Sequence, residues 1–323
     1  MSTHRIGFAV KVLGEGGLPS HDARRWQSDP HLSVSLGYLE AILGYLERHE
    51  LPMYRMVTQL APYATHPDLP QFHGQIEECA EELTAIGARA AELDIRLSSH
   101  PGQYTVLNSE DEKIRRSAAA ELESQAALFD AMGLPAEAVV VIHVGGAAGG
   151  MDAACDRFLE GWELLSDAAR ARVVIENDDR SFAIRTVAEL SKRCGAPVVW
   201  DILHHRCHDP GQVPDREALD LAFATWPEGV VPKIHYSSPR LDMGEKKRKV
   251  GRRVERTPAL PQLRAHADLV DPIAFEYVMR DLGGGRDFDV MVEAKGKDLA
   301  VLRLREQLVA RGMEIEAGRL IVG

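Results

Sequence analysis

The chain has 323 residues, of which 45% are hydrophobic and 27% are charged, and its formal net charge at pH 7 is −11. This composition is typical of a soluble globular enzyme, and α/β barrels commonly occupy this length as one domain. No apolar run approaches the roughly 20 residues of a membrane span, and the N-terminus has no long apolar signal core, so we expect a cytoplasmic protein without a membrane partner.

Strand-like and helix-like segments alternate from end to end, which indicates a parallel sheet with crossover helices. Strands are expected near residues 6–10, 53–57, 95–99, 139–142, 173–175, 198–200, 231–234 and 288–292, where short apolar or β-branched runs occur. Helices are expected near 33–48, 74–92, 111–132, 153–170, 183–194, 215–226, 271–282 and 297–311. These strand–helix units predict an α/β fold, a single (β/α)8 TIM barrel over residues 1–323, with an irregular C-terminal tail over 311–323.

Most of the predicted strands lead into a side chain that can bind a metal ion. These side chains are His100, His143, Glu176, Asp201, His235 and Glu293. In a parallel barrel the C-terminal ends of the strands meet on one face, so one shared pocket is expected. Imidazoles and carboxylates together suit zinc, manganese or iron, and several carboxylates can bridge more than one ion. Because ionisable groups are costly at the ends of buried strands unless they are paired or bind metal, the pattern favours a multinuclear site.

Two further histidines follow these strands. His204 comes three residues after Asp201, a spacing that lets the two side chains serve neighbouring ions. His266 and Asp268 lie in the segment 236–270, which is too long for a simple connection and is expected to contribute to function. Asp268 could bind a metal directly or orient an imidazole.

The same long segment is strongly basic in its middle. The net charge of the whole chain argues, by itself, against a nucleic-acid partner, but the distribution of charge can overrule the sum. Seven basic residues lie between Glu245 and Thr257: Lys246, Lys247, Arg248, Lys249, Arg252, Arg253 and Arg256. Two interpretations stay open, a solvated mobile loop and a loop that contacts phosphates beside the active face.

Several sequence blocks resemble, in order, the signature blocks of the UV damage endonuclease family, which is similar to the endonuclease IV branch of the xylose-isomerase-like barrels. They are HPGQYTVLNS (100–109), VIHVGG (141–146), VIENDD (174–179), KIHYSSP (233–239), RAHADLVDP (264–272) and VEAKGKD (292–298). The resemblance covers nearly the whole chain. It implies a metal-dependent hydrolase that cuts damaged double-stranded DNA on the 5′ side of pyrimidine dimers and 6-4 photoproducts, with abasic sites as further candidates, and leaves 3′-hydroxyl and 5′-phosphate ends. No protein partner is implied.

The resemblance also implies roles for individual residues. It implies three metal ions, with manganese expected, held by His100, His143, Glu176, Asp201, His204, His235, His266 and Glu293, and Glu176 resembles a bridging carboxylate. Gln103 and Tyr104 match a pair that would wedge into the duplex at the lesion, where an aromatic ring can replace lost base stacking. The expected DNA contacts are therefore Gln103, Tyr104, Lys246, Lys247 and Arg248. The expected catalytic set is Glu176, Lys233, His235, Glu293 and His66.

Some of these roles have alternatives. Lys233 matches a lysine that can be carboxylated, and an unmodified lysine that positions phosphate is the other interpretation. His66 matches a histidine near the catalytic face, as a metal ligand or as a phosphate contact. Asn177 and Asp178 are expected to hold Glu176 in place. At the first strand Phe8 and Val12 stand where family members carry Tyr and Asn, which puts lesion contacts from that loop in doubt.

Two other functions fit parts of the pattern. A sugar isomerase or epimerase on the same barrel would also hold divalent metals with His, Asp and Glu, and the fold alone does not distinguish it. A non-catalytic protein that binds damaged DNA could keep the cluster for stability or lesion recognition. The basic segment and the wedge pair favour the endonuclease over the isomerase.

Overall fold

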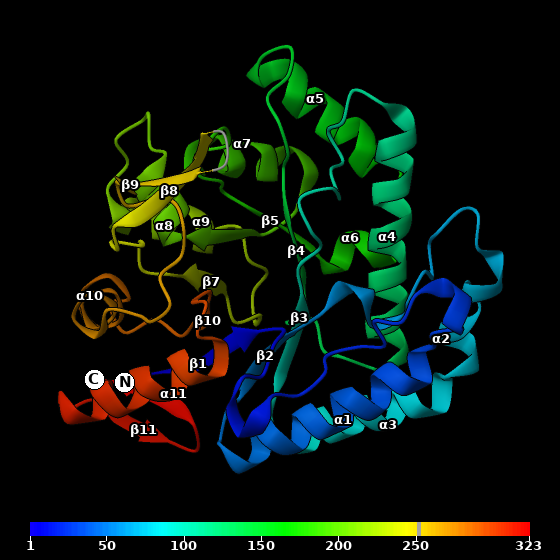
Figure 1. Cartoon of the computed structure of the whole chain (residues 1–323), viewed down its shortest axis with the longest axis horizontal. Coiled ribbons are helices and arrows are strands. Elements are labelled where there is room, and N and C mark those ends of the chain that lie inside the picture. The colour runs from blue at the N-terminus through cyan, green and yellow to red at the C-terminus, as the bar shows by residue number, and fades with distance from the viewer. Residues whose placement is uncertain (251–252) are drawn as a thin grey trace.

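The computed structural model describes residues 1–250 and 253–323 of the chain, and its central element is a closed barrel of parallel strands (Figure 1). The barrel strands are β1 (Ser2–Ala9), β2 (Met53–Met56), β3 (Arg96–Ser99), β4 (Val140–His143), β5 (Val173–Glu176), β6 (Val198–Asp201), β7 (Lys233–Tyr236) and β10 (Asp289–Val292). Each pairs in parallel with the next, and β10 closes the ring because it pairs with both β7 and β1. The predicted α/β TIM barrel is confirmed.

Helices cover the outside of the barrel. They are α1 (Leu32–Arg48), α3 (Ala80–Glu92), α4 (Glu112–Ala131), α5 (Met151–Trp162), α7 (Ile184–Cys194), α9 (Asp215–Phe223), α10 (Pro272–Tyr277) and α11 (Lys297–Ala310). Two predicted helices are interrupted. The segment 74–92 begins with a separate short helix, α2 (Gln75–Glu78). In the segment 153–170, the first helix, α5, ends at Trp162. A new helix, α6 (Asp167–Arg172), starts there because the Ser166 hydroxyl accepts a hydrogen bond from the Ala169 N–H at 3.2 Å.

The C-terminal tail differs from the prediction. Its residues form the hairpin β11 (Glu314–Glu316) and β12 (Arg319–Val322), and β12 pairs antiparallel with the first half of β1. Ala317 and Gly318, which both have positive φ angles (46° and 78°), make a tight turn between the strands. Leu320 and Val322 are buried while their neighbours are partly exposed, so the expectation of an irregular tail was wrong.

The long segment after β7 also forms strands, β8 (Gly244–Val250) and β9 (Arg253–Ala259), which pair antiparallel. Arg252, one of the predicted basic residues, and the side chain of Lys247 lie outside the described part of the chain.

Among the described helices, none combines the length and the apolar character needed to cross a membrane.

A close helix contact supplies a stability test of this packing. A Cβ added at Gly87 in α3 would lie 1.7 Å from the carbonyl oxygen of Met132, whereas a Cβ at Gly37 in α1 would meet nothing within 4 Å. Gly87→Ala should therefore lower the free energy of unfolding by about 1–3 kcal/mol through overpacking. Gly37→Ala, the matched control, should raise it by about 0.5–1 kcal/mol, because alanine is the better helix former.

Urea unfolding followed by circular dichroism measures both variants. Equal changes in the two unfolding free energies would contradict the close approach of α3 to the end of α4.

Candidate active site at the carboxyl end of the barrel

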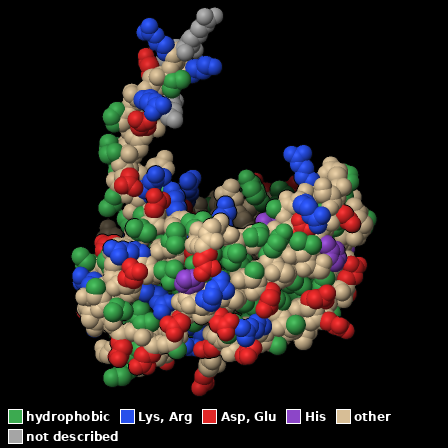
Figure 2. Space-filling model, turned by 60° about the horizontal axis from the view of Figure 1, so that its bottom comes forward, with side chains coloured by type: hydrophobic (Ala, Val, Ile, Leu, Met, Phe, Trp, Pro, Cys, Tyr) green, Lys and Arg blue, Asp and Glu red, His purple; other side chains and the backbone are tan. Residues whose placement is uncertain are grey.

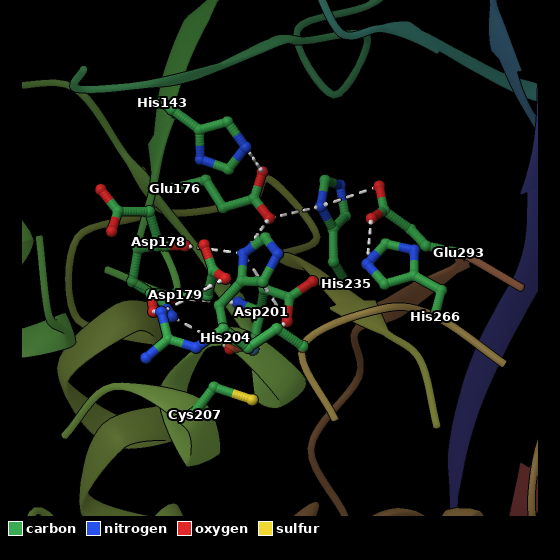
Figure 3. Close-up of polar contacts among 12 residues, drawn as sticks. His143, Glu176, Asp178, Asp179, Asp201, His204, Cys207, His235, His266 and Glu293 are labelled. Carbon is green, nitrogen blue, oxygen red and sulfur yellow. Dashed lines mark hydrogen bonds and ion pairs between the residues drawn. The ribbon is translucent and has the colours of Figure 1, made fainter. Parts of the chain in front are cut away.

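Glu176, the last residue of β5, lies at the centre of a cluster of imidazoles. Its side chain is fully buried, and its Oε2 lies 3.0 Å from His100 Nε2 and 3.8 Å from His143 Nε2. The other oxygen, Oε1, lies 3.0 Å from His235 Nδ1 and 3.4 Å from His204 Nδ1. Figure 3 shows Glu176 between His143, His204 and His235. His143 at the end of β4 and His235 near the end of β7 thus converge on the carboxylate of Glu176, together with histidines that follow β3 and β6.

Two more carboxylates extend the cluster. Asp201, the last residue of β6, is fully buried, and its Oδ1 lies 3.8 Å from His204 Nδ1. Glu293 directly follows β10, with Oε1 at 3.4 Å from His235 Nδ1 and Oε2 at 3.8 Å from His266 Nε2. The structure therefore brings all eight predicted metal ligands into one connected group.

Three overlapping sets within this group could hold a metal ion, since their ligand atoms lie within 4.8 Å of one another. The sets are His100, His143 and Glu176; His100, His235 and Glu293; and Glu176, Asp201 and His204. The buried atoms Asp201 Oδ2, His235 Nε2 and His143 Nδ1 have no hydrogen-bond partner in the described structure. Mixed imidazole and carboxylate donors with unpaired buried atoms fit divalent transition metals.

Burial sets the protonation state of most of these imidazoles. Burial lowers the pKa of His100, His143 and His235, and this shift favours the neutral ring, which is the form that binds metal. Burial alone would raise the pKa of Glu176, but the imidazoles of His235 and His143 hold it well below its usual range. The carboxylate at the centre is therefore ionised.

The Asp201 and His204 pair responds to the negative charge of the cluster. Burial, assisted by Glu176, raises the pKa of Asp201 to about 7. For His204 burial acts to lower the pKa, but the carboxylates of Asp201 and Glu176 outweigh it and raise the pKa to about 11. Both shifts show that this side of the cluster attracts positive charge.

Asn177 holds Asp201 rather than Glu176. The Asn177 amide donates to the Asp201 carbonyl oxygen at 3.0 Å, and its Oδ1 accepts from the Asp201 N–H at 2.9 Å. The Asp201 carboxylate also accepts from the His204 N–H at 2.7 Å and so caps α8 (Ile202–Cys207). These bonds fix the relative positions of the last residue of β6 and the first turn of the next helix.

Lys233 and Arg55 bring basic residues to the cluster. Lys233 in β7 is fully buried, its Nζ has no hydrogen-bond partner among the described residues, and burial holds its pKa well below the usual range. Arg55 in β2 donates a hydrogen bond to Glu293 Oε1. Arg55 was not predicted from the sequence, although a basic residue within the otherwise apolar run MYRM was a usable signal.

Other predicted site residues lie outside the cluster. His66 is exposed in the loop after β2 and belongs to none of the three sets; its Nδ1 accepts from the Asp68 N–H at 3.2 Å. Tyr104 is 83% exposed after β3 and lines a cavity of about 530 Å³ together with His66. Gln103 is also exposed, as are Lys246 and Arg248 on the β8–β9 hairpin.

The two positions in doubt at and after the first strand are buried. Phe8 is fully buried and packs edge-on against Tyr54, with 5.4 Å between ring centroids, and Val12 is buried as well. Asp268 is exposed, belongs to none of the three sets, and accepts from the Gly296 N–H through its carbonyl oxygen at 2.8 Å. Phe8 and Val12 are core residues here.

The fold and the cluster together define an α/β barrel with a candidate metal centre at the carboxyl ends of its strands. The UV-endonuclease UvdE family matches residues 34–317, and the chain belongs to this family. The chain is 31% identical over 309 residues to the UV DNA damage endonuclease of Bacillus velezensis, covering 93% of this chain and 89% of the relative. It is 33% identical over 264 residues to the UV DNA damage endonuclease of Bacillus pumilus, covering 81% and 76%.

Solved structures agree with the architecture. The crystal structure of SacUVDE superposes with a TM-score of 0.77 at 29% identity and covers 96% of this chain and 99% of that chain. The D-psicose 3-epimerase of Clostridium cellulolyticum H10 has a TM-score of 0.50 at 12% identity, covering 90% and 85%, a likeness in fold alone.

The bonds of Asn177 supply a test of the metal centre. Asn177→Ala should weaken Mn²⁺ binding by about 10- to 100-fold, because residues that orient a ligand contribute to affinity on this scale. Asn108→Ala is the matched control, since Asn108 is also buried and donates to a backbone carbonyl, that of Gly146, at 2.8 Å, outside the three sets. Calorimetric titration of metal-free protein measures both affinities, and equal losses would count against the assigned role of Asn177.

Proposed function

We propose that this protein is a metal-dependent DNA repair endonuclease that hydrolyses the phosphodiester bond 5′ to UV photolesions in double-stranded DNA. The substrates would be cyclobutane pyrimidine dimers and 6-4 photoproducts, with abasic sites as further candidates, and the products 3′-hydroxyl and 5′-phosphate ends. The observation that carries the proposal is the set of three overlapping metal-capable groups at the carboxyl face of a barrel in the UvdE family. The named relatives are UV DNA damage endonucleases.

The metal ions would be manganese, three in number, held by the eight clustered imidazoles and carboxylates. When bound, divalent ions would supply activation of water and stabilisation of the charge on phosphorus. The protein's own groups prepare the site. His100, His143 and His235, whose pKa values are lowered, offer lone pairs. The ionised Glu176 is shared by two sets, and Asn177 fixes Asp201. We include Glu176, Lys233, His235, Glu293 and His66 in the catalytic set.

Lys233 has the chemistry for carboxylation. A buried amine with a lowered pKa is neutral, and a neutral amine is the form that reacts with carbon dioxide. The product would place a carboxylate at the end of a side chain whose Nζ has no hydrogen-bond partner among the described residues. An unmodified Lys233 that positions a phosphate is the alternative.

DNA would lie across the carboxyl face and contact exposed side chains around it. The exposed ring of Tyr104 can stack on a base beside the lesion, and the amide of Gln103 can contact unpaired base edges. Lys246, Lys247 and Arg248 would contact phosphates. We also propose that the chain acts as a single domain over 1–323 and needs no protein partner.

An incision assay tests the function. Purified protein with Mn²⁺ is incubated with an end-labelled duplex that carries one photodimer, and wild type should cut on the 5′ side of the dimer. Glu176→Ala should lower the rate by at least about 1,000-fold, because the carboxylate shared by two sets is lost. Glu316→Ala in β11, an exposed position on the tail hairpin, is the control and should cut like wild type.

Each outcome distinguishes the candidate functions. Binding of damaged duplex without cutting by wild type would support a non-catalytic damage-binding protein, and neither binding nor cutting would point to small-molecule chemistry such as sugar isomerisation. Wild-type incision by Glu176→Ala would refute the assigned cluster.

The role of Tyr104 is tested separately. Tyr104→Ala should weaken binding of the photodimer duplex by about 10- to 100-fold, since stacking of one base on an aromatic ring contributes ~1–3 kcal/mol. Metal content should not change, because Tyr104 belongs to none of the three sets. Tyr277→Ala in α10 removes a ring that is 51% exposed and serves as the control. An unchanged preference for damaged over intact duplex, measured by fluorescence anisotropy, would reject the wedge.

A further inference from the structure

The β8–β9 hairpin is an isolated ribbon that stands out from one side of the barrel (Figure 2). Its strands pair over their whole length, from Gly244 with Ala259 to Val250 with Arg253. Every described side chain from Glu245 to Pro258 is exposed. Seven residues per strand, at ~3.3 Å per residue, give the ribbon a length of about 23 Å. Such a projecting ribbon is available to a partner.

Positive charge is concentrated on this ribbon. The segment 245–257 contains seven Lys or Arg and two Glu, a net charge of +5, whereas the whole chain carries −11, so the rest of the chain carries −16. The basic side chains would repel one another in isolation, and the contact of Arg256 with Glu245 at 3.3 Å joins two exposed groups, so it adds little stability. A ribbon with this concentration of positive charge is complementary to a polyanion, so the charge points to a polyanionic partner.

The register distributes the positive charges over both faces of the ribbon. Successive residues of a strand point to opposite faces, so Lys246 and Arg248 share one face with Arg253. Lys249 and Arg256 lie on the other face. A ribbon that lies flat on an anionic surface uses one face only. A groove of duplex DNA has phosphates on both sides, and the major groove admits a two-stranded ribbon.

The root of the ribbon is attached to the candidate metal centre. At the base of the hairpin, Pro239 and His266 form an isolated antiparallel β-bridge. Two backbone hydrogen bonds flank this bridge. The Arg240 N–H donates to the Ala265 carbonyl oxygen at 2.8 Å, and the Ala267 N–H donates to the Ser238 carbonyl oxygen at 2.9 Å. The His266 imidazole faces Glu293 in the cluster. The ribbon and the cluster therefore share a paired backbone segment.

We propose that the β8–β9 ribbon is an arm that enters a groove of the duplex beside the lesion and contacts phosphates of both strands, one with each face. The proposal rests on the proposed function, because DNA at the cluster brings the flanking duplex to the arm. A length of about 23 Å corresponds to roughly 7 base pairs at 3.4 Å each. The arm accordingly requires about that much duplex on one side of the lesion.

Charge variants of each face test the arm. Lys246→Gln/Arg248→Gln/Arg253→Gln neutralises one face, and Lys249→Gln/Arg256→Gln neutralises the other. Lys192→Gln/Arg193→Gln, in the exposed last turn of α7, is the matched control. The binding constant for a 30-base-pair duplex, intact or with one photodimer, is measured over a range of NaCl concentrations. The plot of log K against log[salt] has a negative slope. The magnitude of this slope should decrease by about 2–3 for the first variant and by about 2 for the second, at ~0.9 per phosphate contact. The control should keep the wild-type slope.

Duplex length gives a second measurement. Shortening the duplex on one side of the photodimer to fewer than about 7 base pairs should weaken binding by wild type and leave a variant with all five substitutions unaffected. Shortening the other side should affect both proteins equally. Wild-type binding that ignores flank length on both sides would overturn the proposal.

Other outcomes also decide the proposal. A slope change with one face only would show that the ribbon lies along a single strand, and no change with either face would show that it does not contact DNA; both results reject groove entry. A concentration-dependent dimer in sedimentation that the five substitutions abolish, with unchanged DNA binding, would assign the arm to a second copy of the chain. The salt slopes measured on the intact duplex do not depend on incision, so a failure of incision by wild type would reject the proposed function and leave this measurement of the arm independent.

Discussion

The buried carboxylate of Glu176 is the group on which the geometry of the candidate site depends. Four imidazoles lie within 3.8 Å of it, and they come from segments spread over residues 100–235 of the sequence. An ionised carboxylate is costly in a protein interior unless hydrogen bonds or charges compensate it. The surrounding imidazoles provide that compensation: His235 Nδ1 and His100 Nε2 each lie at hydrogen-bond distance from the carboxylate, and the pKa of Glu176 stays low although burial acts to raise it. The central ligand thus keeps its charge without contact with solvent.

The barrel makes this convergence possible because neighbouring strands end at the same level. His143 pairs in register with Glu176 across β4 and β5, and Asp201 pairs with His235 across β6 and β7. Residues in register on adjacent parallel strands stand side by side. A shift of one residue in either pair would turn one side chain of the pair to the opposite face of the sheet.

The barrel strands and the clustering of the imidazoles and carboxylates could be predicted from the sequence because both follow from burial. Short apolar runs mark strands covered on both faces, and an ionisable residue directly after such a run is placed by the strand direction alone. Features that depend on partners were harder to predict. The tail hairpin forms because β12 completes the free edge of β1, and Arg55 acquires its role only through the contact with Glu293. The strands β8 and β9 are rich in charged residues and lack the alternation of apolar and polar residues that predicts a strand, so the sequence did not indicate that they pair.

The distribution of charge explains how a chain with a net charge of −11 can fit a polyanion. At the carboxyl end of the barrel, the carboxylates of Asp201 and Glu176 raise the pKa of His204 to about 11 in spite of its burial. Carboxylates placed in this way attract cations and, without them, repel a phosphodiester. The basic residues of β8 and β9 are exposed on a separate ribbon, where attraction for phosphates does not compete with the carboxylates for the same space. The basic ribbon and the carboxylates of the cluster are therefore separated in space. They are joined through one backbone segment, because His266 lies at the base of the ribbon and its imidazole contacts Glu293.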